Sequence, residues 1–212
     1  MITKHLILNV LTKISARPQA THLLTAIFLF MNIAAINSTF AATDTYKIDT
    51  KGAHASIKFK IKHLGYSWLY GRFDTFDGTL MLDEKAPENS TIEVTINTSS
   101  INSNHAERDK HLKGSDFLDV KKYPNATFKS TSVSKSGDNT GTIKGELTLH
   151  GVTKTIEIPV THIGGGSDPW GGYRQGFSGS TTLTLKDYGI DFNLGPASTQ
   201  VELILDIEAI KQ

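Results

Sequence analysis

Charged, aromatic and histidine residues gather in one stretch of the chain, HAERDKHLKGSDFLDVKKYP, which runs from His105 to Pro124. Imidazoles and carboxylates of this kind could bind a metal ion or transfer protons. His105 and His111 are six residues apart, a spacing that does not place them on one face of a helix. Because neither an H-E-x-x-H nor a His-x-His spacing occurs, we predict no metal site. The distant histidines that would have to converge with them are His54, His150 and His162.

The sequence also lacks the residue patterns of the common hydrolases. No G-x-S-x-G nucleophile elbow is present. Asp116 and Asp119 could act as the paired acids of a glycosidase, but no aromatic sugar platform accompanies them, and a solvated loop with Asp116 as a cap is the simpler interpretation. The glycines at 164–166 lack the Lys-Ser/Thr of a phosphate-binding loop. They suggest a flexible hairpin, with Trp170 and Tyr173 near its opening. We therefore predict no catalytic residue and no cofactor.

Outside this stretch, apolar and polar residues alternate with a period of two, which is typical of β-strands. In SIKFKIKHL, Ile57, Phe59 and Ile61 share one face and three lysines share the other. Short, evenly spaced strands with tight turns predict an all-β antiparallel barrel or sandwich of about eight strands, and the periodicity leaves the two nearly even. A membrane barrel is disfavoured because no aromatic girdles are present. Turns are predicted at Asp77-Gly78, Glu88-Asn89, Ser136-Gly137-Asp138, Gly164-Gly165-Gly166 and Gly195-Pro196.

A short helix is predicted inside the 105–124 stretch. Asn104 can cap it, and Glu107 three residues later makes a relative of the capping box. The helix should run from about Ala106 to Lys113 and end at Gly114. The residues that follow can pack against the mouth of a β-structure; they are Phe117, Leu118 and Val120.

The first 42 residues differ in composition from the rest of the chain. Three basic residues and no acidic one precede an apolar run at Leu23–Ile36, and small residues flank Phe40. This pattern predicts a secretory signal peptide over residues 1–42, cleaved near Ala41 or Ala42. A membrane anchor is the alternative, but the run of 14 residues is shorter than the roughly 20 that span a bilayer.

The remaining residues, 43–212, suit a single domain. Without residues 1–42 the 22 basic residues fall to 19 against 21 acidic ones, a net charge near −2. That balance disfavours a nucleic-acid partner. The chain has no cysteine, so disulfides, thiolate metal sites and thiol nucleophiles are excluded. We predict a periplasmic protein whose mature chain is not inserted in a membrane, with full secretion as the alternative.

Several ordered motifs occur from about Tyr46 to the carboxyl end. They are Asp49 and His54; His63; Gly71, Phe73, Phe76 and Gly78; Ser100-Ile101; Arg108-Asp109; His111-Leu112; Asp116-Phe117; Tyr123-Pro124; Phe128; and GELTLHGVTK at 145–154. Together these motifs resemble the signature of the YceI-like family. The resemblance implies an eight-stranded antiparallel lipocalin-like barrel with a short helical insert, over residues 43–212, that holds an isoprenoid or another long-chain amphiphile.

A barrel of this size either fills its interior with side chains or holds one slender ligand, and apolar inward residues look the same in both cases. His63 is in register with Ile57 and Phe59 and could contact a polar headgroup, although hydrogen bonding to a neighbour is the simpler interpretation. Arg108 could also contact it, or could hold the insert down through an ion pair with a nearby aspartate. The predicted wall residues are Phe59, Ile61, Phe73, Phe76, Phe117, Phe128 and Trp170.

We therefore predict a non-catalytic binding or carrier protein for an isoprenoid such as a quinone or a polyprenyl lipid. The 105–124 stretch would be a lid and brace on the barrel. One alternative is an envelope enzyme acting on a lipid or sugar, with two titratable groups converging in a cleft. Another is an adaptor for a membrane redox protein, with an exposed apolar patch near Phe117 and Tyr123. A homodimer is left open.

Overall fold

The fold is built almost entirely from strands. The structure, a computed structural model, describes residues 43–212, so the predicted signal peptide at 1–42 lies outside the described residues. From the amino end the strands are β1 (Asp44–Ile48), β2 (Ser56–His63), β3 (Ser67–Phe73), β4 (Phe76–Leu82), β5 (Thr91–Asn97), β6 (Ile101–Asn102), β7 (Asn125–Lys135), β8 (Thr140–Leu149), β9 (Val152–Ser167), β10 (Tyr173–Thr184) and β11 (Gln200–Lys211).

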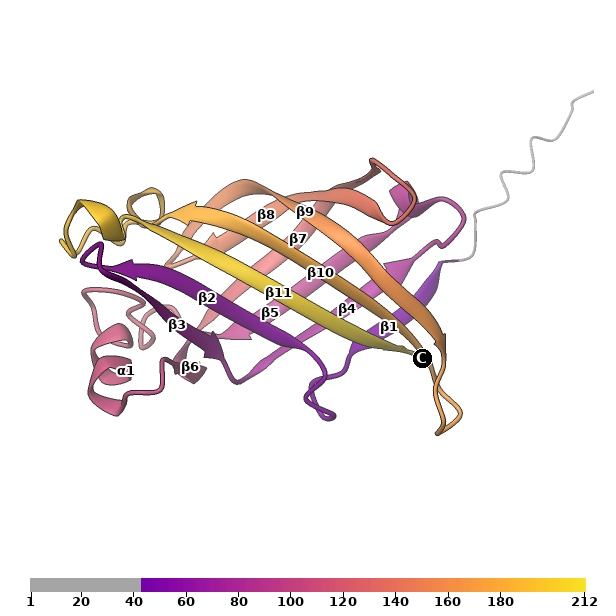
Figure 1. Cartoon of the computed structure of the whole chain (residues 1–212), viewed down its shortest axis with the longest axis horizontal. Coiled ribbons are helices and arrows are strands. Elements are labelled where there is room, and N and C mark those ends of the chain that lie inside the picture. Colours follow the sequence, from indigo (N-terminus) through magenta and orange to yellow (C-terminus); the bar gives the residue numbers. More distant parts are fainter. Residues whose placement is uncertain (1–42) are drawn as a thin grey trace, which may run out of the picture. The chain divides into compact units, whose positions relative to one another are not determined.

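Eight of these strands close an antiparallel barrel (Figure 1). The order around the ring is β1-β4-β5-β7-β8-β9-β10-β11, and β11 returns to β1 through the pairs Tyr46↔Lys211 and Ile48↔Ala209. Closure leaves none of the eight strands as an open edge of the ring. The expectation of an eight-stranded antiparallel barrel is confirmed, and the sandwich alternative is wrong.

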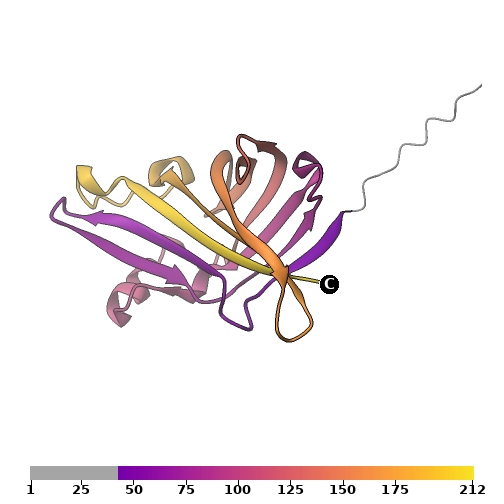
Figure 2. The same ribbon diagram turned by 45° about the vertical axis from the view of Figure 1, so that its right-hand side comes forward.

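The other three strands widen one side of the barrel. The last residues of β11 pair with β1, but its earlier residues Val201–Asp206 pair with β2 instead. β2 pairs with β3, and β3 pairs with the two residues of β6. The wall therefore splits along β11, and β2 and β3 form a flap at the end of the barrel that also carries the helix (Figures 1 and 2).

The helices are short and all lie between strands. The predicted helix exists, but its cap is His105 rather than Asn104: the His105 Nδ1 accepts a hydrogen bond from the Arg108 backbone N–H at 3.2 Å. Asn104 instead has a positive φ of 61°, so it makes the turn into the cap. The helical elements are η1 (Pro87–Asn89), η2 (Thr98–Ser100), α1 (Ala106–Leu112), η3 (Leu185–Tyr188) and η4 (Pro196–Ser198).

Two predicted turns lie inside strands. Asp77-Gly78 belongs to β4, where a Cβ on Gly78 would come within 2.7 Å of the Glu93 carbonyl oxygen on β5. The glycine is therefore there for close packing of neighbouring strands, not for a turn. The glycines at 164–166 belong to β9 and pair with β10. A Cβ on Gly165 would collide with the side chain of Gln175, so this glycine leaves room for that side chain.

Candidate binding cavity

The end of the barrel that carries α1 is filled with side chains. After α1 the chain folds back, and the Leu118 N–H donates to the Leu112 carbonyl at 3.1 Å. This places Phe117 against His111 and Phe192, with ring centroids 4.9 and 5.1 Å away. These rings cover a buried apolar cluster, which we call the plug. Its buried members are Phe59, Ile101, Phe117, Leu118, Phe128, Leu147, Ile158, Leu183, Tyr188, Ile190 and Val201.

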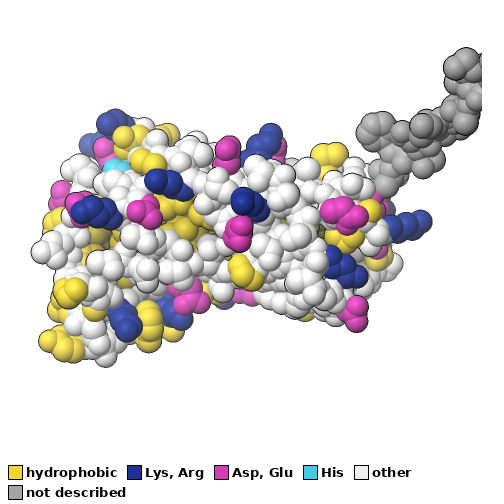
Figure 3. All heavy atoms as spheres, turned by 90° about the horizontal axis from the view of Figure 1, so that it is seen from above, with side chains coloured by type: hydrophobic (Ala, Val, Ile, Leu, Met, Phe, Trp, Pro, Cys, Tyr) yellow, Lys and Arg dark blue, Asp and Glu magenta, His cyan; other side chains and the backbone are white. Residues whose placement is uncertain are grey.

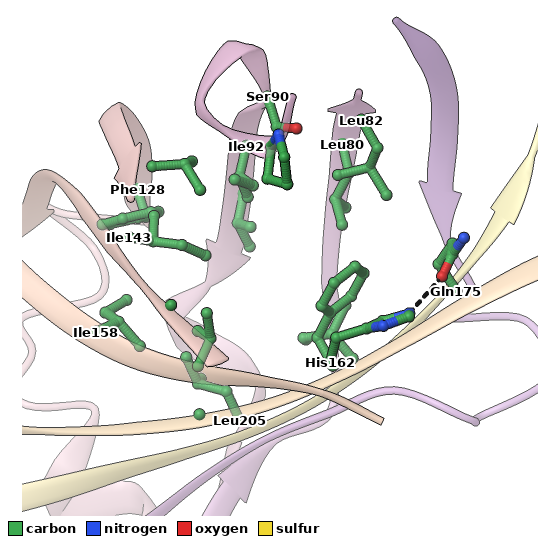
Figure 4. Close-up of a pocket in the computed structure, with 18 of the residues that line it drawn as sticks. Leu80, Leu82, Ser90, Ile92, Phe128, Ile143, Ile158, His162, Gln175 and Leu205 are labelled. Atoms are coloured by element: carbon green, nitrogen blue, oxygen red, sulfur yellow. Dashed lines mark hydrogen bonds between the residues drawn. The ribbon is translucent and has the colours of Figure 1, made fainter. Parts of the chain in front are cut away.

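The other half of the barrel is hollow. It contains a cavity of about 390 Å³, which falls within the size range of small-molecule sites. The cavity reaches inward to Phe128 and Ile158 of the plug and outward to the β4–β5 and β7–β8 loops, at the opposite end from α1 (Figures 1 and 4). Figure 4 labels ten of the lining residues: Leu80, Leu82, Ser90, Ile92, Phe128, Ile143, Ile158, His162, Gln175 and Leu205.

Inward leucines at the two ends of the barrel can differ in exposure. On β10, Leu183 in the plug is 3% exposed, whereas on β11 the inward Leu203 and Leu205 remain partly exposed. Both leucines of β11 line the cavity. A leucine at the plug end is thus packed on all sides, whereas a leucine that lines the cavity has empty space on one side. The leucine at the cavity makes fewer dispersion contacts as a result.

The opening carries a connected set of polar side chains. His162 on β9 contacts Gln175 on β10, with 2.6 Å between Nε2 and Oε1 (Figure 4). The Gln175 Nε2 donates to Glu84 Oε1 at 2.7 Å, and the Tyr46 hydroxyl donates to the same oxygen at 3.2 Å. Gln175 is 4% exposed, and its amide is satisfied on both sides. Burial raises the pKa of Tyr46 to about 12, so this hydroxyl stays protonated.

The β4–β5 loop at the opening is held by its own hydrogen bonds. Asp83 Oδ1 accepts from the backbone N–H groups of Ala86 and Lys85, at 2.9 and 3.0 Å. The bond from Ala86, followed by one from the Asn89 side chain, lowers the pKa of Asp83. Ser90 Oγ in turn accepts from the Asp83 N–H at 3.0 Å. This loop therefore presents a fixed rim and an ionised carboxylate.

A cluster of ion pairs lies at the same end of the barrel but outside the cavity lining. Arg174 bonds to Asp49 and Glu208 at 2.6 Å each and to Asp168 at 2.7 Å, and His54 bonds to Asp49 at 2.9 Å. We call these five residues the arginine cluster. Asp49, His54 and Glu208 have the spacing of a metal site, but the guanidinium already provides their positive partner. The cluster ties the turn after β1 to the β9–β10 turn, the start of β10 and the end of β11.

The acidities in the arginine cluster follow from this arrangement. Burial alone would raise the pKa of Asp49, but hydrogen bonds from His54, Arg174 and the Gly52 N–H outweigh it and lower the pKa to about 2. The Gly172 N–H and then Arg174 lower the pKa of Asp168. The lowered pKa values of Asp49 and Asp168 come from ion pairing outside the cavity. They do not come from catalytic groups that converge in a cleft, which the enzyme alternative requires.

Most of the predicted wall residues belong to the plug end. Of the nine predicted ligand-binding residues, Phe128 lines the cavity. Phe59 and Phe117 are buried in the plug, and Ile61 and Phe73 pack against it. Phe76 packs against smaller apolar clusters in the barrel. Their contact with a ligand stays a prediction.

The polar candidates and Trp170 also lie away from the cavity lining. His63 is exposed at the β2–β3 hairpin. Arg108 makes no ion pair with an aspartate among the described residues. It donates to Ser103 Oγ at 2.8 Å and to the Ser103 carbonyl at 2.5 Å, which braces the start of α1. Trp170 is 78% exposed in the β9–β10 turn and stacks over Arg174.

The residues at the opening were missed by sequence reasoning, although one signal was present. His162 continues the alternating stripe of Ile156, Ile158 and Val160 by one step, which places it on the inner face of β9. Gln175 and Glu84 lie 13 and 78 residues from it along the chain and have no motif of their own. Only barrel closure brings them together.

The outer surface shows no expanse of one charge on the face seen in Figure 3, where basic and acidic side chains alternate. An adaptor would need an exposed apolar patch near Phe117. Phe117 itself is 6% exposed, but Phe192, whose ring packs against it, is 44% exposed. Other exposed aromatics lie on β3 and its hairpin, at Tyr66, Trp68 and Tyr70. Among residues 43–212, no helix has the length and apolar character to cross a bilayer.

The fold and the cavity define a small antiparallel β-barrel with an apolar lumen that is open at one end. The model of the YceI-like domain matches residues 46–209, and the chain belongs to the YceI-like family. It is 60% identical over 167 residues to a UPF0312 protein of Pseudomonas aeruginosa, covering 79% of this chain and 87% of the relative.

Solved structures agree on the fold. The YCEI protein of Campylobacter jejuni superposes with a TM-score of 0.65 at 30% identity, covering 72% of this chain and 91% of that one. A domain of Saccharophagus degradans, described as a polyisoprenoid binding domain, superposes with a TM-score of 0.60 at 16% identity, covering 79% and 98%. The second likeness concerns the fold alone.

Proposed function

We propose that this protein is a non-catalytic binding protein that holds one slender amphiphile of the isoprenoid type in the hollow half of its barrel. The observation that carries the proposal is the cavity of about 390 Å³, whose inner walls are aliphatic and aromatic and whose opening is polar. The domain from Saccharophagus degradans, which is described as binding polyisoprenoids, has the same fold.

Burial of the hydrocarbon chain in the cavity would supply most of the binding free energy. Each buried CH₂ contributes about 0.8 kcal/mol, so one five-carbon unit contributes at most about 4 kcal/mol. A long chain would then exceed the observed ceiling of roughly 18–21 kcal/mol, and ordering of the chain must offset much of this gain. Chain length therefore supplies affinity, whereas selectivity has to come from the opening.

The arrangement favours one orientation of the bound lipid. The plug fills the end next to α1, and the polar side chains of Glu84, His162 and Gln175 lie at the other end. A chain that enters through the opening would point its tail toward Phe128 and leave its headgroup among these three residues. The α1 insert then acts as the floor of the lumen, not as a lid over the headgroup.

The proposal includes the periplasmic location that residues 1–42 predict, and a role as carrier or store in that compartment. An apolar lumen would hold the lipid chain away from water while the protein moves between membranes. No cofactor is needed for such a role.

Native co-purification tests the proposal. The full chain is expressed with its own amino-terminal segment in a bacterium with two membranes, isolated from the periplasm, and extracted with organic solvent for mass spectrometry. We expect an isoprenoid lipid at close to one molecule per protein. Val160→Trp, which fills the lumen, should remove it, and Thr161→Trp, on the outer face of the same strand, should not. A protein that carries no lipid, or equal loading of both variants, would contradict the proposal.

A further inference from the structure

The polar network at the opening has a fixed direction of hydrogen-bond donation. The Glu84 carboxylate oxygen receives both the Gln175 amide at 2.7 Å and the Tyr46 hydroxyl at 3.2 Å. An ionised carboxylate can only accept, so the NH₂ end of Gln175 must face Glu84. Its carbonyl end therefore faces His162.

This orientation of Gln175 determines which nitrogen of His162 carries the proton. The Gln175 Oε1 lies 2.6 Å from His162 Nε2 and can only accept, so Nε2 is the protonated nitrogen. In the neutral imidazole, Nδ1 is then an acceptor. Within residues 43–212, Nδ1 makes no hydrogen bond to another residue, although the ring lines the cavity and packs on Phe177 at 5.2 Å between centroids. The opening thus holds an oriented acceptor without a protein donor.

The charges around the opening are mostly negative. Among the described residues that line the cavity, three carry carboxylates and one carries an ammonium group. Hydrogen bonds within its own loop keep Asp83 in its ionised form. Glu84 lies next to Gln175 at the opening and accepts a hydrogen bond from it. An anionic headgroup would meet like charge here, which is unfavourable at close range. The residues that carry these four groups are Asp83, Glu84, Lys135 and Asp138, and the neutral His162 lies beside them.

We infer that the bound lipid carries an uncharged hydroxyl headgroup, as in a free prenyl alcohol or a hydroquinone, and that His162 Nδ1 accepts its hydrogen bond. The inference rests on the proposed function and specifies the ligand class of the same cavity. It distinguishes hydroxyl lipids from phosphorylated lipids, esters and quinones with the same chain. A phosphorylated headgroup would meet the carboxylates at the opening, and an ester or a quinone has no donor to offer to His162 Nδ1.

Three lipids of one chain length test this inference: geranylgeraniol, geranylgeranyl acetate and geranylgeranyl diphosphate. Their affinities for the purified protein are measured by isothermal titration calorimetry at about pH 8, where a histidine side chain is in its neutral form. We expect the alcohol to bind about fivefold tighter than the acetate, the size of one neutral hydrogen bond, and the diphosphate to bind most weakly.

Two variants assign the preference to His162. His162→Phe keeps an aromatic ring on Phe177 but removes the acceptor, so it should bind alcohol and acetate equally. Thr161→Val, whose side chain is exposed on the outer face of β9, should keep the preference of the unmodified protein. If none of the three lipids binds, the proposed function fails and this inference with it. If acetate or diphosphate binds as tightly as the alcohol, or if His162→Phe keeps the preference, the proposed function stands and this inference is overturned.

Discussion

The two ends of this barrel are built from the same kind of strand and differ in what lies inside them. At the α1 end, aromatic rings from β2, β7 and the segment after α1 meet and exclude space, so that inward residues such as Leu183 are 3% exposed. At the other end, inward aliphatic residues such as Leu205 face a cavity. A repeating strand pattern therefore does not determine whether a lumen is filled. Inserted segments and ring side chains decide it.

The largest difference between the two ends is expected for a matched pair of leucine truncations. Leu183→Ala should lower the free energy of unfolding by about 2–5 kcal/mol, because the buried site cannot collapse around the cavity that it leaves. Leu205→Ala should cost only about 1 kcal/mol, because one side of this leucine already faces open space. Urea denaturation followed by circular dichroism measures both. Equal losses would show that the cavity is filled in solution.

The arginine cluster should contribute strongly to the stability of the hollow half of the barrel. Arg174→Met removes the guanidinium from the Asp49 and Asp168 carboxylates, which are 5% and 7% exposed, and this should destabilise the fold by about 3 kcal/mol. Lys129→Met, which removes an exposed ion pair with Glu93 on the outer surface, should cost less than about 1 kcal/mol. Thermal melts of the two variants at neutral pH compare them. A similar small shift for both would mean that the cluster contributes little.

The same cluster makes stability depend on acid pH. The pKa of Asp49 is about 2 in the folded protein, below its ordinary value of 3.8, so its contribution is fully present above about pH 4 and is lost as the pH falls toward 2. The loss from this group should be about 1–2 kcal/mol. Unfolding free energies measured between these pH values should fall less steeply in Asp49→Asn than in the unmodified protein. Parallel slopes would contradict the assignment.

The smallest effect is expected at the helix of the closed end. His105→Ala removes the side chain that caps α1 and should cost about 0.5–1 kcal/mol. Because α1 lies at the far end from the opening, binding of geranylgeraniol should be unchanged. A large loss of binding in this variant would place the headgroup near α1 and reverse the proposed orientation.

Much of the fold could be predicted from local alternation, because each strand of a barrel has one face toward the interior. The stripe of Ile57 and Phe59 and the helix at Ala106–Leu112 were predicted from such patterns, and the structure contains both. The turns at Asp77-Gly78 and at residues 164–166 were wrong, because a glycine that allows close packing inside a strand has the same local signature as one in a turn.

The candidate site was harder to predict for a different physical reason. Phe59, Phe73 and Phe117 were expected to line a lumen because they are apolar and inward, but apolar inward residues also build a plug. The polar residues at the opening interact only across the closed ring, and no spacing in the sequence relates Glu84 to His162 and Gln175. Local periodicity determines which face a residue is on, whereas the distribution of space inside the barrel depends on long-range packing.

A crystal structure of the protein with geranylgeraniol bound tests the central claim most directly. We expect density for a single chain between Ile143 and Leu205, with its tail toward Phe128 and its hydroxyl beside His162. Density for the lipid on the exposed face of β3, or a lumen closed by side chains with no lipid inside it, would contradict lipid binding in the hollow half of the barrel.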